Sequence, residues 1–362
     1  MKKMSPWPCQ YGNSQARNQA SAAGPRRGLV TAQCTFENGV FYTPLIGEND
    51  EIVIALRESI IMLDRHLKRK WEKDLCSPRT LAFWGKGKLV IGCTDGLAHI
   101  DSSKKLTILP LPDEFKKGSL TPFIHIVAGP SNNLYALTGD AVFCMNEDFE
   151  ILWSENLAAR FGLFGGWRMA LSKGGQVFIS GAFSWSTEDE SKEYAGYLAA
   201  LSEKGEFLWQ KNHDLDSLPT SSGISLRLTT SDSELWLSDA GAACYDFDGN
   251  LRWRDQDEEK IAFVQAISND NQAVLTRKEE VFSLSSQNNF HEHHIAMLNG
   301  WPHEMVMDSE RVLYILTSEG LEGWSYSGEQ IFEIKGIIGD RISIGNGYLV
   351  VSSRRGKITV VE

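Results

Sequence analysis

The stretch that decides the fold is residues 245–253, which read YDFDGNLRW. An apolar segment is followed by Asp248-Gly249, a dipeptide typical of tight hairpin turns, and then by a second segment that ends at Trp253. Residues 201–209 (LSEKGEFLW) and 145–153 (MNEDFEILW) repeat the phrase, and residues 63–71 and 324–332 carry degraded copies. Each copy predicts a strand, a turn and a second strand that is closed by an aromatic residue.

The closing aromatics have a regular spacing. They stand at Trp71, Trp153, Trp209, Trp253 and Phe332, separated by roughly 40 residues, by about twice that, or by one step with an insertion of about 15. A period near 40 with strand–turn–strand content is the signature of propeller blades, which cover each other's faces by stacking around an axis. Degenerate copies at 88–101, 273–284 and 348–361 bring the number of units to eight.

The eighth unit ends after its third strand, and residues 28–36 form a strand-like segment with no partner of its own. Pairing the two closes the ring and removes two exposed sheet edges. The sequence therefore predicts an all-β protein, an eight-bladed β-propeller of four-stranded antiparallel blades. This single domain covers residues 28–362, is closed by an N-terminal strand and follows an extended leader, residues 1–27. A seven-bladed ring with one miscounted unit is the alternative.

Composition narrows the function classes. The formal net charge of −11 argues against nucleic-acid binding, because the phosphate backbone repels such a surface. The sequence shows no transmembrane span, and no apolar region follows the basic start of the leader, so we expect a soluble, cytoplasmic monomer without membrane insertion. An exported form that lacks its signal peptide is the alternative. The six cysteines have no zinc-site spacing.

A family resemblance rests on two features. Residues 7–18 read WPCQYGNSQARN, and this leader together with the repeated phrase around the closing tryptophans resembles the pyrroloquinoline-quinone-like (quinoprotein-like) repeat family. That family includes quinoprotein dehydrogenases and the outer-membrane-assembly propeller lipoprotein. The resemblance implies that the closing tryptophans dock onto the neighbouring blade and are structural. Because the chain lacks the vicinal cysteine pair and the calcium-binding constellation of the dehydrogenases, we expect no quinone cofactor, and no cofactor of any kind.

Aligning the blades predicts a polar ring at one mouth of the central channel. We took the residue that follows the first turn of each blade and counted nine residues back along the chain. In six blades this position carries a polar side chain, and two more blades fit with a shift of one residue. The predicted ring consists of Thr43, Thr80, His125, Arg168, Arg227, Gln265, His303 and Asp340, with Trp167 and Trp301 beside it. Arginine and histidine there would suit an anionic ligand, and His125, His303 and Asp340 form a candidate acid/base group. The alternative is that these side chains only bind channel water, so catalytic residues stay unknown.

Two further segments attract attention. The insertion in the fourth blade carries Trp185, Glu188, Asp189, Glu190 and Tyr194, an acidic stretch between aromatics, which predicts either a contact with a partner protein or a plain elongated hairpin loop.

Residues 290–294 read FHEHH, but in a strand only His291 and His293 share a face. They are therefore a weak metal candidate, and no metal site is predicted.

The sequence favours a non-catalytic scaffold that binds a protein partner through its loops. The alternative is a protein that binds a small anionic ligand, or an enzyme, with its site at the channel mouth. The sequence does not identify the partner or the ligand.

Overall fold

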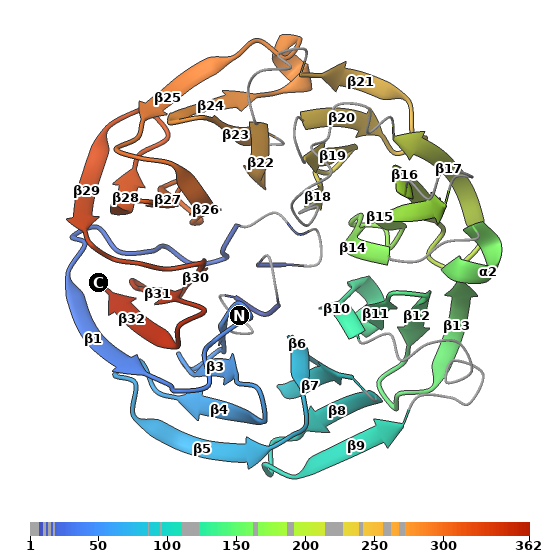
Figure 1. Cartoon of the computed structure of the whole chain (residues 1–362), viewed down its shortest axis with the longest axis horizontal. Coiled ribbons are helices and arrows are strands. Elements are labelled where there is room, and N and C mark those ends of the chain that lie inside the picture. Colours follow the sequence, from blue (N-terminus) through green and yellow to red (C-terminus); the bar gives the residue numbers. More distant parts are fainter. Residues whose placement is uncertain are drawn as a thin grey trace.

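The computed structural model of the 362-residue chain describes residues 7–9, 12–13, 16, 19–85, 87–94, 96–110, 123–161, 166–186, 192–213, 227–238, 242–255, 262–267 and 272–362. Eight four-stranded antiparallel sheets stand around a central axis as the blades of a propeller (Figure 1). The first strand of each blade faces the axis and the fourth lies at the rim. The predicted fold is therefore confirmed, and the seven-bladed alternative is wrong.

Counted from the axis to the rim, the strands of blades 1 to 4 are β2 (Leu45–Ile46), β3 (Ile52–Ala55), β4 (Ser59–Leu63) and β5 (Arg69–Asp74); β6 (Pro78–Trp84), β7 (Lys88–Cys93), β8 (Gly96–Ile100) and β9 (Leu106–Pro110); β10 (Phe123–Ala128), β11 (Leu134–Thr138), β12 (Ala141–Met145) and β13 (Ile151–Asn156); and β14 (Gly166–Leu171), β15 (Val177–Ser186), β16 (Lys192–Leu201) and β17 (Phe207–His213).

The strands of blades 5 to 8 are β18 (Arg227–Thr230), β19 (Glu234–Ser238), β20 (Ala242–Asp246) and β21 (Leu251–Arg254); β22 (Ala262–Ile267), β23 (Ala273–Arg277), β24 (Glu280–Leu284) and β25 (His293–Met297); β26 (Pro302–Met307), β27 (Leu313–Thr317), β28 (Gly320–Trp324) and β29 (Gln330–Lys335); and β30 (Arg341–Ile344), β31 (Leu349–Ser352), β32 (Lys357–Val361) and β1 (Val30–Thr35). The short helices are α2 (Leu157–Phe161), η1 (Pro130–Asn132) and η2 (Ser286–Asn288).

The turn of the repeated phrase is held by its first polar residue. Asp246 Oδ1 accepts hydrogen bonds from the backbone N–H of Asp248 at 3.1 Å and of Asn250 at 2.7 Å. Such a side-chain bond fixes a turn locally, which is why Asp, Asn and Ser recur at this place. The same pair of bonds is made in four other blades by Asp64, Asp101, Asn146 and Ser202.

The closing tryptophans join neighbouring blades. The indole N–H of Trp153 donates to the carbonyl of Glu203 at 2.9 Å, and that of Trp209 donates to the carbonyl of Phe247 at 2.8 Å. Both acceptors lie in the turn of the next blade. Each blade is thus fastened to the next by the turn and the aromatic residue of the same phrase.

The N-terminal strand closes the ring as predicted. Strand β1 pairs antiparallel with β32, from Val30 opposite Val361 to Thr35 opposite Lys357. The first and last segments of the chain therefore share blade 8, and this pairing covers an edge that β32 would otherwise expose.

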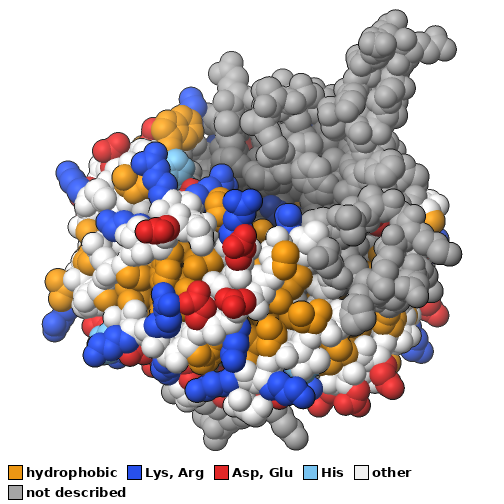
Figure 2. Space-filling view, turned by 60° about the horizontal axis from the view of Figure 1, so that its bottom comes forward, with side chains coloured by type: hydrophobic (Ala, Val, Ile, Leu, Met, Phe, Trp, Pro, Cys, Tyr) orange, Lys and Arg blue, Asp and Glu red, His pale blue; other side chains and the backbone are white. Residues whose placement is uncertain are grey.

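Apolar side chains fill the space between the blades, and Tyr135, Phe178, Trp236 and Tyr314 are among the fully buried ones. On the outer wall that carries β1, β5 and β9, apolar side chains alternate with charges of both signs (Figure 2). None of the helices in the described ranges is long and apolar enough to span a bilayer.

Candidate functional site: the central channel and the leader

The N-terminal leader lies inside the ring, against the strands that surround the axis. Figure 1 shows its blue trace crossing the middle of the propeller. Trp7 forms an antiparallel bridge with Ile46 at the end of β2, and Cys9 forms one with Ala82 on β6. The backbone bonds are Trp7 N–H to the Ile46 carbonyl at 3.3 Å and the Phe83 N–H to the carbonyl of Pro8 at 2.7 Å. The leader thus adds backbone pairing to the inner edges of blades 1 and 2.

Burial in the channel changes the chemistry of these leader residues. Trp7 is 1% exposed and Cys9 is 3% exposed. Burial raises the pKa of the Cys9 thiol to about 12, so the sulfur stays protonated at neutral pH and is a poor nucleophile. The sequence alone indicated an extended leader; the structure places its described residues inside the ring.

Further along, the leader crosses to blades 7 and 8. The backbone N–H of Ala20 donates to the carbonyl of Met307 at 2.8 Å, and the carbonyl of Ala22 accepts from Ser309 N–H at 3.1 Å. The carbonyl of Ala23 accepts from Gly347 N–H at 2.9 Å. These bonds lie at or after the ends of first strands β26 and β30, so the leader occupies the end of the channel where first strands finish.

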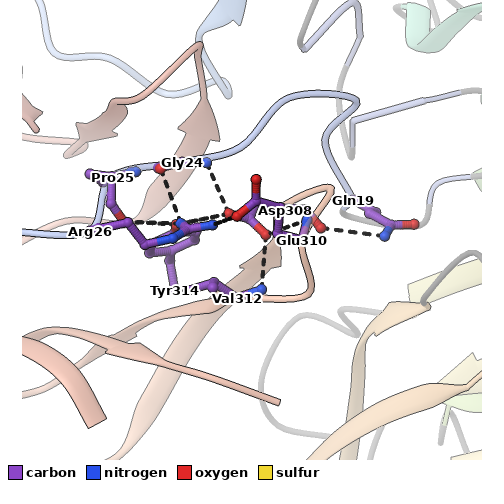
Figure 3. A network of polar contacts seen from close by, with 8 residues as sticks. All are labelled: Gln19, Gly24, Pro25, Arg26, Asp308, Glu310, Val312 and Tyr314. Carbon is purple, nitrogen blue, oxygen red and sulfur yellow. Dashed lines mark hydrogen bonds and ion pairs between the residues drawn. The ribbon is translucent and has the colours of Figure 1, made fainter. Parts of the chain in front are cut away.

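A buried carboxylate, Asp308, anchors this crossing (Figure 3). Its Oδ2 accepts from the Gly24 N–H at 2.9 Å and from Arg26 Nη1 at 2.8 Å. The hydroxyl of Tyr314 lies 3.1 Å from the same oxygen and 2.6 Å from Arg26 Nη1. The side chain of Asp308 is 0% exposed, so its charge is compensated within this network.

The same residue also builds its own turn. Asp308 Oδ1 accepts from the N–H groups of Glu310 and Val312, both at 2.8 Å, which is the side-chain turn of the repeated phrase at another place in the blade. One carboxylate therefore fixes a turn with one oxygen and the leader with the other.

The network explains the pKa directions of its members. Burial raises the pKa of the Tyr314 hydroxyl, and the Asp308 charge adds to this. Burial alone would lower the pKa of Arg26, but its hydrogen bonds to Glu310 and Asp308 outweigh that effect and raise it. At neutral pH the Tyr314 hydroxyl therefore stays protonated and uncharged, and the Arg26 guanidinium stays charged.

Four predicted ring residues share one level of the channel. Thr80, His125, Arg168 and Arg227 lie on the first strands of blades 2 to 5, opposite Gly92, Leu137, Ser180 and Ser238 on the second strands. Thr43 precedes β2 by two residues. Thr43, Thr80 and His125 are buried and Arg168 is half-buried.

The register is different in the last three blades. The residues opposite the equivalent second-strand positions are Phe263, Glu304 and Arg341, in place of the predicted Gln265, His303 and Asp340. His303 is exposed in a bulge between Pro302 and Glu304, and Gln265 lies in the bulge between Val264 and Ala266.

Asp340 precedes β30, and its Oδ2 accepts from the Arg354 N–H at 2.7 Å. Trp167 falls in the bulge between Gly166 and Arg168, and Trp301 is 49% exposed before β26.

This register changes which charged side chains stand at this level of the channel. Arg341 Nη1 lies 3.2 Å from Glu304 Oε2, so the cation of blade 8 is already neutralised by a buried carboxylate of blade 7. The proposed acid/base group is not assembled, because His125 is buried in blade 3 while His303 is exposed in blade 7, across the ring (Figure 1).

The fourth-blade insertion forms a projecting hairpin. Strands β15 and β16 pair from Val177 opposite Leu201 to Ser186 opposite Lys192. The two flanking strands pair over a shorter length. Strand β14 pairs with β15 only as far as Gly181, and β17 pairs with β16 only as far as Gly196. Residues 182–186 and 192–195 are therefore a two-stranded finger beyond the blade. Trp185 and Tyr194 lie on it, opposite Glu193 and Ser184, and Glu188, Asp189 and Glu190 lie outside the described residues.

The histidines of residues 290–294 do not gather around one point. His291 and His293 are exposed, and Glu292 between them is bound to Arg277 at 2.6 Å. Across the described ranges no group of three potential ligands is placed to hold a metal ion.

Comparisons with known proteins identify the fold and not the function. No family model matches the chain, and no curated relative matches it. BamB from Moraxella catarrhalis is 14% identical over 92% of this chain and 99% of its own, with a TM-score of 0.60. A streptogramin B lyase is 12% identical over 91% and 95%, with a TM-score of 0.52. BBS1N, solved in complex with ARL6DN, is 11% identical over 92% and 97%, with a TM-score of 0.56.

The shared fold is the β-propeller. A lyase and a domain solved in a complex both have this fold, so the function of this chain has to be argued from its own sites.

Proposed function

We propose that this protein is a non-catalytic scaffold that binds a partner protein through loops at one face of the propeller, with the projecting finger as a principal contact. We further propose that it belongs with the quinoprotein-like propellers and acts as a cytoplasmic monomer. The repeated turn and the docked tryptophans support the first of these two assignments.

The finger carries the main proposal. An isolated two-stranded hairpin is marginally stable in water, because it has no third strand and no covered face. Residues 182–186 and 192–195 nevertheless stay paired beyond the blade, and Phe183, Trp185 and Tyr194 belong to these two strands. Aromatic side chains on a ribbon that a rigid scaffold projects are typical of partner contacts. The leader in the channel supports the same view, since it fills one end of the space that a channel ligand would use.

The test compares variants in partner capture. Residues 183–195 are replaced by Asn-Gly, and a second variant carries Trp185→Ala with Tyr194→Ala. We expect both to keep the thermal unfolding midpoint and to lose a stoichiometric partner that wild type captures. The matched control is Trp301→Ala, which removes an exposed aromatic elsewhere and should retain the partner. Equal capture by all four proteins contradicts the proposal.

A second candidate is a small anionic ligand at the polar channel level. Four buried hydroxyls lie on second strands at this level, those of Ser180, Ser238, Thr276 and Ser352, and none has a hydrogen-bond partner within the described part of the chain. Buried polar groups are normally bonded, so these hydroxyls favour a polar occupant. Titration with citrate and inorganic phosphate should give binding that Arg168→Met abolishes and the exposed control Arg355→Met preserves; no binding to wild type contradicts it.

A further inference from the structure

A groove runs along the rim between blades 5 and 6, where β21 and β25 are neighbours (Figure 1). Its larger part is a cavity of about 670 Å³ lined by residues 251–255, Arg277 and Glu292. Its smaller part is a cavity of about 450 Å³ lined by Ser233, Glu234, Asp246, Arg252, Ser286 and Phe290. Arg252 lines both cavities, so they adjoin, and we call the two together the rim groove.

The groove exists because the connection in blade 6 departs from the repeat. Where the next blade has the tight turn, its backbone carbonyl covers the preceding tryptophan, as at Trp153 and Trp209. After β24 the chain instead forms η2, followed by Asn289 and Phe290 with φ of 56° and 58°. The Phe290 ring stacks on Trp253 with centroids 6.0 Å apart. This wider connection leaves space beside Trp253 that the other turns fill.

A carboxylate without a counter-charge lines the smaller cavity. Glu234 is 6% exposed; the neutral thiol of Cys244 is hydrogen-bonded to its carboxylate, but Oε2 has no hydrogen-bond partner among the described residues. It lies directly opposite Asp246 in the β19–β20 pairing, and like charges at directly opposite positions destabilise a sheet. Asp246 has a cation, Arg252 Nη2 at 2.9 Å from its Oδ2. The pair as a whole therefore has one negative charge in excess at a buried site.

The larger cavity is lined by three arginines, Arg252, Arg254 and Arg277, and by two carboxylates, Asp255 and Glu292. Arg277 is bound by Asp255 at 3.1 Å and by Glu292 at 2.6 Å, and its guanidinium lies 4.3 Å from the centroid of the Phe282 ring. Burying an uncompensated carboxylate is costly, so Glu234 is the group that gains most from an added cation.

We propose that the rim groove binds an extended segment of a partner protein, and that Glu234 and Asp246 receive the guanidinium or ammonium group of a basic side chain in that segment. The smaller cavity takes this side chain beside Phe290, and the larger cavity receives the neighbouring residues over Trp253 and Leu251, which is 53% exposed. The two cavities together are larger than one side chain fills, so neighbouring residues of the segment have room beside the basic one. The inference rests on the proposed scaffold function but uses a different surface from the finger.

The test uses purified protein and blocked heptapeptides of alternating serine and valine with a central arginine, lysine or citrulline. We expect the arginine and lysine peptides to bind at least tenfold more tightly than the neutral citrulline peptide. Glu234→Gln should remove that preference, while Glu206→Gln, an exposed carboxylate in the corresponding region of blade 4, should keep it. Ser286→Lys places a cation at the cavity from an exposed position and should also block binding, which covers the case in which Glu234→Gln fails to fold.

Stability supplies a second readout. Without peptide, Glu234→Gln should raise the thermal unfolding midpoint, because it removes an uncompensated buried charge; a lower midpoint overturns the proposal by giving Glu234 a structural role. Equal binding of charged and neutral peptides, no binding, or binding of calcium chloride or free arginine without the peptides also overturns it. Such a failure leaves the finger test unaffected, so the two proposals fail separately.

Discussion

At the scale of single residues, Asp308 joins a turn of blade 7 to the leader. Asp308→Asn keeps the oxygen that fixes its own turn but can place an amide N–H₂ against the Gly24 N–H and Arg26 Nη1, where only donors stand. Leaving Arg26 without its buried partner should cost about 2–4 kcal/mol of unfolding free energy. Urea unfolding measures the loss, and limited proteolysis should show cleavage within residues 1–27 before the ring unfolds.

The control for Asp308 is Asp101→Asn. Asp101 fixes the same kind of turn, with bonds from Ser103 N–H at 2.8 Å and Lys105 N–H at 3.0 Å, but it does not hold the leader. We expect little change in stability and no early cleavage. Equal effects of the two substitutions would assign the whole effect to the turn and contradict the anchoring role.

His99 should make stability depend on pH. Burial lowers its pKa from the ordinary 6.5, Lys88 and Lys105 act in the same direction, and Asp101 opposes them. Its ring stacks on Phe149 with centroids 4.7 Å apart. The unfolded state then binds a proton at His99 more readily than the folded state does. The contribution of neutral His99 to the unfolding free energy is therefore complete above about pH 6.5 and is lost as pH falls toward the folded pKa.

The measurement compares wild type with His99→Gln in urea at about pH 7.5 and about pH 5. Wild type should lose more unfolding free energy than the variant across this interval. Parallel losses would mean that the folded environment does not disfavour the charged imidazole.

The channel level shows which residue placements the sequence could predict. A constant nine-residue step located Thr80 and Arg168, because five residues separate the paired positions Phe83 and Leu89 in blade 2, as they do Leu171 and Val177 in blade 4. His125 and Arg227 were reached with a shift of one residue. In blade 7 the step started from Val312, the last residue of the turn and not the first of β27, and in blade 8 the turn is one residue shorter. A slip of one residue exchanges neighbouring side chains, so Glu304 and Arg341 were missed.

At the scale of elements, the glycine of the repeated turn has two separate tasks. Gly205 has a φ of +81°, and a Cβ there would lie 2.5 Å from Cδ2 of Trp153. Gly347 has a similar φ of +82°, but a Cβ there would meet nothing within 4 Å. Gly347→Ala should therefore cost about 1 kcal/mol for the backbone alone, and Gly205→Ala about 2–4 kcal/mol, because the tryptophan must also shift.

Urea unfolding of the two glycine variants isolates the contact between blades. The difference between them should shrink when both are made in a Trp153→Ala background, which removes the ring that the new methyl group meets. If the difference persists there, the second task of Gly205 is not the tryptophan contact.

The turn also explains why the blades could be predicted from sequence. Its three requirements are local: a polar side chain that caps the turn, a residue that tolerates positive φ, and an aromatic that docks on the next turn. Each leaves a residue type at a fixed offset, as in Asp246, Gly249 and Trp253. The connection after β24 keeps the capping side chain, Ser285, which accepts from the Gln287 N–H, and it has positive φ at Asn289 and Phe290, but it contains no glycine and lacks the docked tryptophan. The rim groove therefore has no sequence signal beyond the charged Glu234 at the start of an apolar strand.

At the scale of the whole molecule, the leader was the least predictable part. Ala20, Ala22 and Ala23 are held by their backbone groups, which every residue carries, so their pairing with the inner strands leaves no pattern in residue types. Ring closure was predictable, because an unpaired strand at one end of the chain matched a missing strand at the other.

Two truncations separate these contributions to the ring. Removal of residues 1–27 keeps β1 and should give a folded monomer with a lower unfolding midpoint, because the inner edges of β2, β6 and β26 lose their backbone partners. Removal of residues 1–36 also deletes β1 and exposes the edge of β32, whose Ile358, Val360 and Val361 are fully buried in the intact blade. A long apolar edge strand pairs with other copies, so this variant should self-associate in sedimentation velocity experiments. If it stays monomeric with the midpoint of the shorter truncation, ring closure by β1 adds nothing that the remaining seven complete blades do not already provide.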